Sequence, residues 1–328
     1  MVERLRQQPC IFTLIAVVQP FSKISFLIPI PQEIGTGSVD VGKGCFPCLI
    51  AVMSALDSYR HNSKEKPVEL DERVITRAII SRYQEKLEKS LEADVAIAGG
   101  GPAGLVAGYY LAQGGYNAVL FERKLSVGGG MWGGGMMFNE IAVQEAAIDI
   151  YNEFGIRYRE FEKGYYTSDA VETVTSLCAQ AVQTGLTVFN CVSAEDVLMR
   201  KDRVIGLVLN WSAVEIANLH VDPLAVRSGY VIDATGHATE VVKVVQKKVP
   251  GRLDTKSGKI EGEQSMWSDR AETLTLENTR EVFPGLFVAG MAANAVSGGP
   301  RMGAIFGGML LSGKKAAEEI MPRLGKGI

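Results

Sequence analysis

Sulfur and imidazole side chains are scarce in this chain of 328 residues, which contains five cysteines and three histidines. The number of cysteines is odd and they are widely spread, which argues against a disulfide scaffold and favours a reducing compartment, the cytoplasm. Cys45 and Cys48 have the spacing of a redox or zinc half-site, but no second such pair accompanies them. A small disulfide-stabilised secreted protein is therefore not expected.

Long apolar runs and a strong net charge are also absent. No uninterrupted apolar stretch reaches about 18 residues, so no membrane-spanning helix is expected. The formal net charge is −3, which does not indicate a nucleic-acid or membrane-surface partner. Hydrophobic residues make up 47% of the chain, as is ordinary for a globular protein with a sizeable core.

The first part of the chain lacks the periodicity of a helix or a strand. We expect residues 1–65 to be an N-terminal extension outside the fold, with Met53 as a candidate start of the natural protein. A charged linker at residues 63–67 then leads into a single α/β domain, expected to span residues 66–328.

Glycine, in contrast, is plentiful, and its 36 residues gather in a few clusters. The first cluster lies between an apolar strand expected at residues 94–98 and a helix expected at 102–113, with a second strand at 117–121. This βαβ beginning predicts an α/β fold of the Rossmann type, similar to glutathione reductase, with an inserted β-rich segment. Further helices are expected at 69–91, 140–154, 170–184 and 302–321, strands at 187–189, 230–233 and 286–289, and a hairpin at 192–209.

The glycine turn has the pattern of a dinucleotide site. Gly99, Gly101 and Gly104 fit G-x-G-x-x-G, in which glycine permits a tight turn and a close approach to a pyrophosphate. Glu122 ends the second strand, 18 residues after Gly104, where a carboxylate accepts hydrogen bonds from ribose hydroxyls and disfavours a 2′-phosphate. NAD or FAD is therefore favoured over NADP. Arg123 either contacts adenine or phosphate or is a solvated surface charge.

One position separates NAD from FAD. Flavoenzymes of the glutathione-reductase type carry a late strand that runs into Gly-Asp, and that Asp binds the ribityl region of the flavin. Here the strand runs into Gly290 and Met291, which weakens the flavin interpretation although the turn at residues 234–236 is flavoprotein-like.

Two of the three histidines lie near carboxylates. His220 and Asp222 are two positions apart, so both point to the same side of an extended segment, and His237 follows the turn after the strand at 230–233. Histidine and carboxylate with open positions suit a non-haem Fe(II) site. The alternative is a capping aspartate beside ordinary polar histidines.

Taken together, these segments resemble the thiamine thiazole synthase family, in its archaeal and bacterial branch. The resemblance runs from about residue 69 to residue 324. It is carried by residues 99–104, 121–123, 128–136, 219–223, 233–237 and 291–303.

The resemblance implies that NAD is a substrate, assembled with glycine and a sulfur source into an ADP-linked thiazole carboxylate. It implies Fe(II) ligands at Asp222 and His237 from neighbouring protomers of a homo-oligomer, expected to be an octamer. Arg301 is expected to bind the glycine carboxylate, since a guanidinium offers it two donors. The nucleotide-derived part is expected to contact Ala103, Glu122, Arg123, Gly130, Ala194, His220, Val221, Asp222 and Met291.

His220 distinguishes this chain from fungal and plant relatives, in which a cysteine at this position donates its own sulfur. A histidine cannot do so, and the resemblance therefore implies a true catalyst that takes sulfide from solution with Fe(II). His220 is then a candidate for catalytic proton transfer, because its ordinary pKa is near neutrality. The alternatives are a ribose-1,5-bisphosphate isomerase, an FAD-dependent oxidoreductase of similar fold, and a non-catalytic NAD-binding protein.

Overall fold

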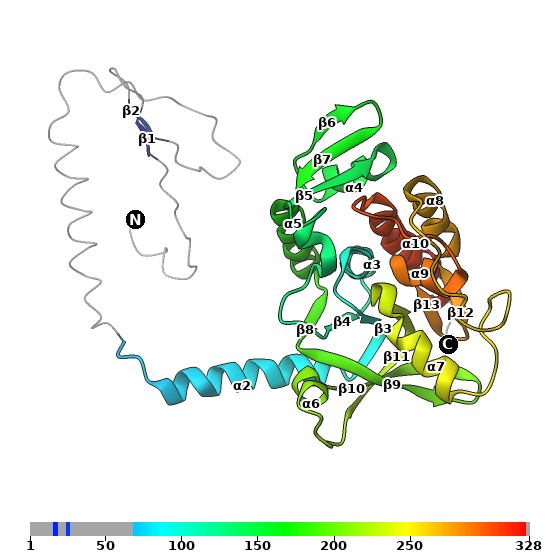
Figure 1. Cartoon of the computed structure of the whole chain (residues 1–328). Coiled ribbons are helices and arrows are strands. Elements are labelled where there is room, and N and C mark those ends of the chain that lie inside the picture. The colour runs from blue at the N-terminus through cyan, green and yellow to red at the C-terminus, as the bar shows by residue number, and fades with distance from the viewer. Residues whose placement is uncertain (1–15, 19–23, 27–67, 326–328) are drawn as a thin grey trace, which may run out of the picture. The chain divides into compact units, whose positions relative to one another are not determined.

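The computed structural model describes residues 16–18, 24–26 and 68–325 (Figure 1). The chain divides into two compact units, residues 1–75 and 76–328. In the first unit, β1 (Ala16–Val18) pairs antiparallel with β2 (Ile24–Phe26). The expected boundary after residue 65, the Cys45–Cys48 pair and the candidate start at Met53 lie outside the described residues, so these predictions are untested.

A largely parallel sheet forms the centre of residues 76–328. Its strands lie in the order β12-β13-β11-β3-β4-β8, and only β12 runs antiparallel to its neighbour in this path. The strands are β3 (Glu92–Ala98), β4 (Ala118–Glu122), β8 (Thr187–Asn190), β11 (Leu224–Asp233), β12 (Arg280–Phe283) and β13 (Leu286–Val288).

The sheet has an apolar core on each face. Alternate residues of β3 point to opposite faces, so Val95 and Ile97 join one core and Ala96 and Ala98 join the other. Both faces of a parallel sheet must be covered, which explains why β3 and β4 read as nearly continuous apolar runs.

Three helices contribute buried residues to the first core: α3 (Pro102–Gln113), α5 (Ala170–Thr184) and α10 (Gly307–Leu324). Helices α3 and α10 pack closely, since a Cβ atom built on Gly313 would lie 2.3 Å from the Ala103 carbonyl oxygen. The hairpin of β9 (Val192–Arg200) and β10 (Arg203–Trp211), together with α7 (Glu240–Lys248), contributes to the second core. This arrangement confirms the Rossmann-type fold with an inserted β-rich segment.

A second, three-stranded antiparallel sheet lies in the order β5-β7-β6. Its strands are β5 (Glu140–Gln144), β6 (Arg159–Glu162) and β7 (Tyr165–Asp169). The helix expected at 140–154 is thus wrong in its first half, and only η2 (Glu145–Ala147) and α4 (Ile148–Glu153) follow β5. Burial alternates along β5, with Ile141 and Val143 inward, which is the period of a strand rather than a helix.

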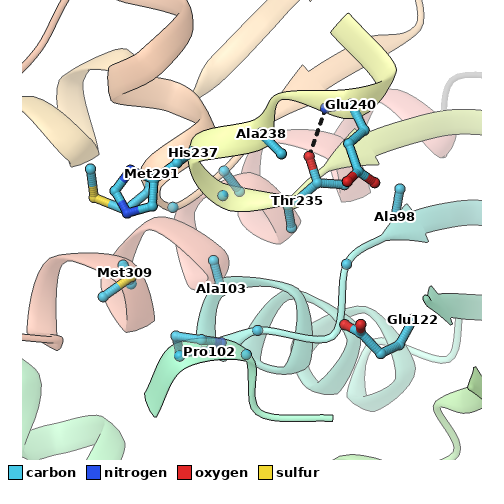
Figure 2. Close-up of a pocket in the computed structure, with 18 of the residues that line it drawn as sticks. Ala98, Pro102, Ala103, Glu122, Thr235, His237, Ala238, Glu240, Met291 and Met309 are labelled. Carbon is cyan, nitrogen blue, oxygen red and sulfur yellow. Dashed lines mark hydrogen bonds between the residues drawn. The ribbon is translucent and has the colours of Figure 1, made fainter. Parts of the chain in front are cut away.

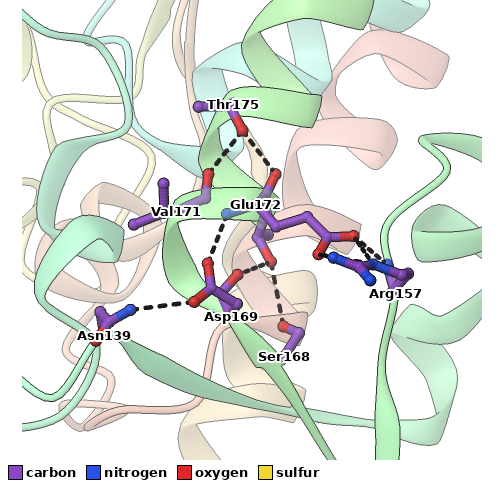
Figure 3. A network of polar contacts seen from close by, with 8 residues as sticks. Asn139, Arg157, Ser168, Asp169, Val171, Glu172 and Thr175 are labelled. Carbon is purple, nitrogen blue, oxygen red and sulfur yellow. Dashed lines mark hydrogen bonds and ion pairs between the residues drawn. The ribbon is translucent and has the colours of Figure 1, made fainter.

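A polar network joins this small sheet to α5 (Figure 3). Asp169 caps α5 by accepting from the Glu172 backbone N–H at 2.8 Å, and Asn139 donates to its other oxygen at 3.1 Å. Arg157 in turn binds both oxygens of the Glu172 carboxylate, at 2.7–3.0 Å. The cap satisfies a free donor at the helix start and fixes the angle at which β7 enters α5.

The remaining helices are shorter or more exposed. They are α2 (Glu72–Lys89), α6 (Ser212–Ile216), α8 (Ser268–Asn278) and α9 (Met291–Ser297). No residue of α2 is buried, and its Ile79 and Ile80 are exposed. The closing helix was expected from residue 302 but begins at Gly307, because residues 301–306 form a loop.

Glu272 of α8 lies at the start of α10. Its Oε2 accepts the Gly308 backbone N–H at 2.6 Å, whereas among the described contacts its buried Oε1 and the Gln144 Oε1 have no hydrogen-bond partner. Burial raises the pKa of Glu272 to about 7, and its hydrogen bonds offset this only in part. Burying a carboxyl costs less in its protonated form than in its charged form, so burial favours the neutral side chain here.

We therefore expect Glu272→Gln to change the pH dependence of stability. The folded-state pKa exceeds the unfolded value, so the native protein holds a proton that the unfolded chain has lost, and stability falls as pH rises from about 4.5 to 7. Glutamine removes this loss, by at most about 3 kcal/mol at pH 8. Urea unfolding at pH 5 and pH 8 measures it, with Glu277→Gln on the exposed side of the same helix as control. A difference that does not vary with pH would contradict the assignment.

Candidate functional site

The carboxyl ends of four parallel strands meet at one edge of the sheet. The segments that follow β3, β4, β11 and β13 line one cavity of about 1010 Å³ (Figure 2). Ligands of open α/β sheets bind at this edge, outside the strand ends. The topology alone therefore brings together residues that lie far apart in the sequence.

The glycines of the first turn divide into two kinds. A Cβ atom on Gly99, whose φ is +101°, would lie 2.4 Å from the Ala234 carbonyl oxygen, and one on Gly104 would lie 2.0 Å from the Gly99 carbonyl oxygen. Packing therefore requires glycine at positions 99 and 104, because neither has room for a Cβ atom. Gly101 and Gly130 line the cavity, and a Cβ atom on either would meet nothing within 4 Å. These two leave open space beside the N-terminus of α3, where backbone N–H groups attract an anion.

Glu122 stands at the end of β4, 6% exposed. Its Oε2 accepts the Gly100 backbone N–H at 2.7 Å, and its Oε1 accepts that of Lys124 at 2.8 Å. Each carboxylate oxygen has capacity for a second donor, so a ligand hydroxyl is able to bind as well. Glu122 thus holds the glycine turn in place and also lines the cavity.

Arg123 makes an ion pair within the cavity wall. Its guanidinium lies 2.6 Å from the Glu240 carboxylate at the start of α7, and both residues line the cavity. Burial raises the pKa of Glu240, and Arg123 opposes that shift. Arg123 is therefore not simply a solvated charge, and its place beside the acidic end of β4 suits a nucleotide contact.

A buried aspartate shapes the turn after β11. Asp233 is completely buried, and its Oδ1 accepts both the backbone N–H and the hydroxyl of Thr235, at 3.0 and 2.7 Å. Its Oδ2 accepts the Val242 N–H at 3.0 Å, while Thr235 accepts the Glu240 N–H at 2.8 Å. Burial raises the pKa of Asp233, and these hydrogen bonds counteract the shift. The turn leading to His237 is consequently fixed.

The cavity has two chemically different ends. In Figure 2, Glu122 and Glu240 lie toward one end, and His237, Met291 and Met309 lie toward the other. His237 belongs to η3 (Gly236–Ala238), is half-exposed, and has its Nδ1 in hydrogen-bond contact with Glu263. One end thus offers backbone donors and carboxylates, and the other offers an imidazole among thioethers.

Three further predicted residues line the same cavity. Ala194 lies on β9, Met291 begins α9, and Arg301 lies in the loop before α10. The Arg301 backbone is held by Gln264 and Trp267, at 3.2 and 3.1 Å. Arg301 is thus supported by its main chain while its side chain is exposed.

The segment that contains His220, Val221 and Asp222 lies elsewhere. Residues 215–225 are all exposed, and none of them lines the cavity. Asn210 donates to the Val221 carbonyl at 3.0 Å, which holds the segment beside β10. The structure therefore does not place Asp222 along the cavity that His237 lines.

The described residues of one chain form no complete metal site. Among the described residues, no group of three or more His, Cys, Asp and Glu side chains is placed to hold a metal ion. His237 fits as a single ligand, since its ring is half-exposed in the cavity wall. The sharing of ligands between protomers, and the catalytic role of His220, stay predictions.

Sequence reasoning missed several residues of the cavity wall. Lys124, Glu240, Ser265 and Met266 line it, and Glu263 contacts His237 from 26 residues away. Glu240 follows the Thr235 turn and begins α7, so an acidic residue at a helix start was a signal that could have predicted it. Glu263 lies in a loop with no periodic pattern, so no local signal marks it.

The sheet order, the glycine turn and the cavity at the strand ends define a Rossmann-type α/β protein. Residues 76–306 match the model of the Thi4 family, and the chain belongs to this family.

Relatives and a solved structure agree with that membership. The chain is 66% identical to the thiamine thiazole synthase of Desulfosudis oleivorans and 58% identical to that of Methanothermobacter thermautotrophicus, each over 78% of this chain and 100% of the relative. The crystal structure of Thermovibrio ammonificans THI4 superposes with a TM-score of 0.76 at 54% identity, covering 78% of this chain and 99% of that one. The chain is therefore an enzyme of thiamine thiazole biosynthesis, and the isomerase and flavoenzyme alternatives are not favoured.

One finding concerns membranes. Within residues 68–325, no helix combines the length and the apolar character needed to cross a bilayer.

The two kinds of glycine predict unequal losses of stability on the same substitution. Gly104→Ser forces a Cβ atom into the Gly99 carbonyl and should lower the free energy of unfolding by about 1–3 kcal/mol. Gly101→Ser should change it by no more than about 0.5 kcal/mol, because serine is a good helix N-cap and the space is open. Chemical denaturation of both variants decides the matter. Equal losses would contradict the division into packing and cavity glycines.

Proposed function

We propose that this enzyme forms the ADP-thiazole carboxylate precursor of thiamine from NAD, glycine and sulfide, with Fe(II) as cofactor. The observation that carries the proposal is the single cavity that joins the glycine turn and Glu122 at one end to His237 and Arg301. A substrate that spans the cavity would keep its ADP part at the glycine end and present its reacting ribose toward His237.

The nucleotide end suits NAD. The pyrophosphate would lie at the N-terminus of α3, in the space left by Gly101 and Gly130, with Ala103 beside it. Glu122 would accept from the adenosine ribose hydroxyls, and its charge would oppose the 2′-phosphate of NADP. Ala194 and Met291 would add apolar contacts from β9 and α9.

Arg301 would bind the glycine carboxylate. A guanidinium presents two parallel N–H donors to a carboxylate, and this bidentate pairing orients the ligand as well as holding it. The backbone of Arg301 is tied to Gln264 and Trp267, so little main-chain ordering would be needed on binding.

His237 would bind Fe(II) together with Asp222 of a neighbouring protomer. Bound there, the ion would supply a Lewis acid and a template for sulfide. The exposed segment 215–225 carries four large apolar side chains, Ile216, Leu219, Val221 and Leu224, which fits contact with another copy of the chain. That contact would also bring His220 to the neighbouring cavity, where it would transfer protons.

The proposal predicts turnover from four components. Purified protein supplied anaerobically with NAD, glycine, sulfide and Fe(II) should yield an ADP-thiazole detectable by mass spectrometry, many times per protomer. Asp222→Ala should abolish the product, and His220→Ala should slow it if His220 transfers protons. Intact NAD recovered from the complete mixture, with a folded protein, would contradict the proposal.

A shared site also predicts complementation between inactive variants. In oligomers coexpressed from Asp222→Ala and His237→Ala chains, about a quarter of the sites should combine an intact His237 with an intact Asp222. Turnover should therefore return to about a quarter of the wild-type value, although each variant alone is inactive. Mixed oligomers that remain inactive would show that both ligands come from one chain.

A further inference from the structure

Glu263 contacts the imidazole of His237 from a separate segment of the chain. Its Oε1 is in hydrogen-bond contact with His237 Nδ1. The Glu263 side chain is 20% exposed and that of His237 is 50% exposed, so the carboxylate is the more buried partner. The carboxylate is therefore shielded from solvent to a greater extent than the ring that it contacts.

The chemistry of this pair fixes the direction of the hydrogen bond. An ionised carboxylate only accepts, so Nδ1 of His237 must carry the proton and donate it to Glu263. The neutral ring then keeps the lone pair on Nε2. Histidines that ligate metals commonly make this second hydrogen bond to a carboxylate, which fixes both the tautomer and the ring orientation.

The backbone around Glu263 is held on both sides. Gly262 donates its N–H to Ala295 at the end of α9, and Gln264 donates its N–H to Gly299, each at 3.0 Å. The Gln264 side chain also donates to the Gly298 carbonyl at 2.7 Å. Helix α9 packs against η3, the element that carries His237. The carboxylate thus sits on a main chain that cannot shift independently of the cavity wall.

The same loop also sets the position of Arg301. Gln264 accepts the Arg301 backbone N–H at 3.2 Å, and Arg301 accepts that of Trp267 at 3.1 Å. Residues adjacent in the loop therefore support the two functional side chains, His237 and Arg301, one through a carboxylate and the other through the backbone.

We propose that Glu263 is a positioning residue that holds His237 in the Nδ1–H tautomer, with Nε2 directed to a divalent cation. This inference rests on the proposed function for the cation, but its effect on the tautomer does not. Glu263 acts through His237 and contacts neither substrate nor metal.

The first test needs no metal. The chain has only three histidines, so protein labelled with ¹⁵N-histidine gives three imidazole patterns in solid-state NMR, and His237→Gln identifies the one of interest. Metal-free wild-type protein should show His237 protonated on Nδ1. Glu263→Ala should move the proton to Nε2, which is the form that free imidazole side chains favour in water. A wild-type His237 already protonated on Nε2 would overturn the proposal.

The second test measures Co(II) affinity through its visible absorption. Glu263→Ala should weaken Co(II) binding by about 10–100-fold, whereas ADP affinity should not change. Glu261→Ala is the matched control, because its carboxylate lies in the same loop but accepts the Ser257 N–H at 2.6 Å. A loss in Glu263→Ala smaller than twofold would contradict a positioning role, and a loss equal to that of His237→Ala with a changed spectrum would make Glu263 a direct ligand.

The two tests separate this inference from the proposed function. If the wild-type protein shows the Nδ1–H tautomer but His237→Ala leaves Co(II) binding unchanged, the metal site is refuted while the positioning of His237 stands. If Co(II) binds at His237 and the tautomer does not respond to Glu263→Ala, the metal site stands and the role of Glu263 is refuted.

Discussion

The site depends on one close approach of backbones. Gly99 and Gly104 leave no room for a side chain, so the turn after β3 contacts the first turn of α3 and the Ala234 carbonyl after β11. That contact sets two strand ends side by side. One provides the glycine turn and the helix N-terminus, and the other continues into Thr235 and His237. A packing constraint thus determines how far the nucleotide end of the cavity lies from its imidazole end.

Buried carboxylates hold these turns in place. Glu122 accepts two backbone N–H groups and Asp233 accepts two backbone N–H groups and a hydroxyl, so both are satisfied although they are almost fully removed from water. A buried charge without such partners costs several kcal/mol. Movement of either loop would break these hydrogen bonds and would therefore be opposed by that free energy. The walls of the cavity are therefore rigid where the ligand would be held. The proposed role of Glu263 is similar, since its carboxylate would fix the ring of His237 through a hydrogen bond.

Sequence patterns predicted correctly those helices and strands whose spacing and turn residues lie within one short segment of the chain. The strand–glycine–helix unit ending at Gln113, the helix Ala170–Thr184 and the hairpin turning at Lys201, which has a positive φ of 52°, were all predicted from spacing and turn residues. The prediction of a helix at residues 140–154 was wrong in its first part. There Ile141 and Val143 have the spacing of a strand, although the surrounding stretch is rich in helix-forming residues. Contacts such as Glu263 with His237 join segments far apart in the chain, and single-sequence periodicity carries no information about them. The family resemblance, in contrast, named Ala194, Met291 and Arg301, which line the cavity although no local pattern marks them, because a resemblance transfers positions rather than patterns.

A cation shared between protomers, as proposed above, would link metal binding to assembly. Residues 215–225 place Asp222 within an exposed apolar segment, away from the cavity that His237 lines. If the cation joins Asp222 of one protomer to His237 of another, the free energy of metal binding is also free energy of association. By linkage, the metal then strengthens the contact between protomers as much as that contact strengthens metal binding. An isolated protomer would keep its nucleotide end intact and lack the metal, so nucleotide binding and thiazole formation would respond differently to dissociation.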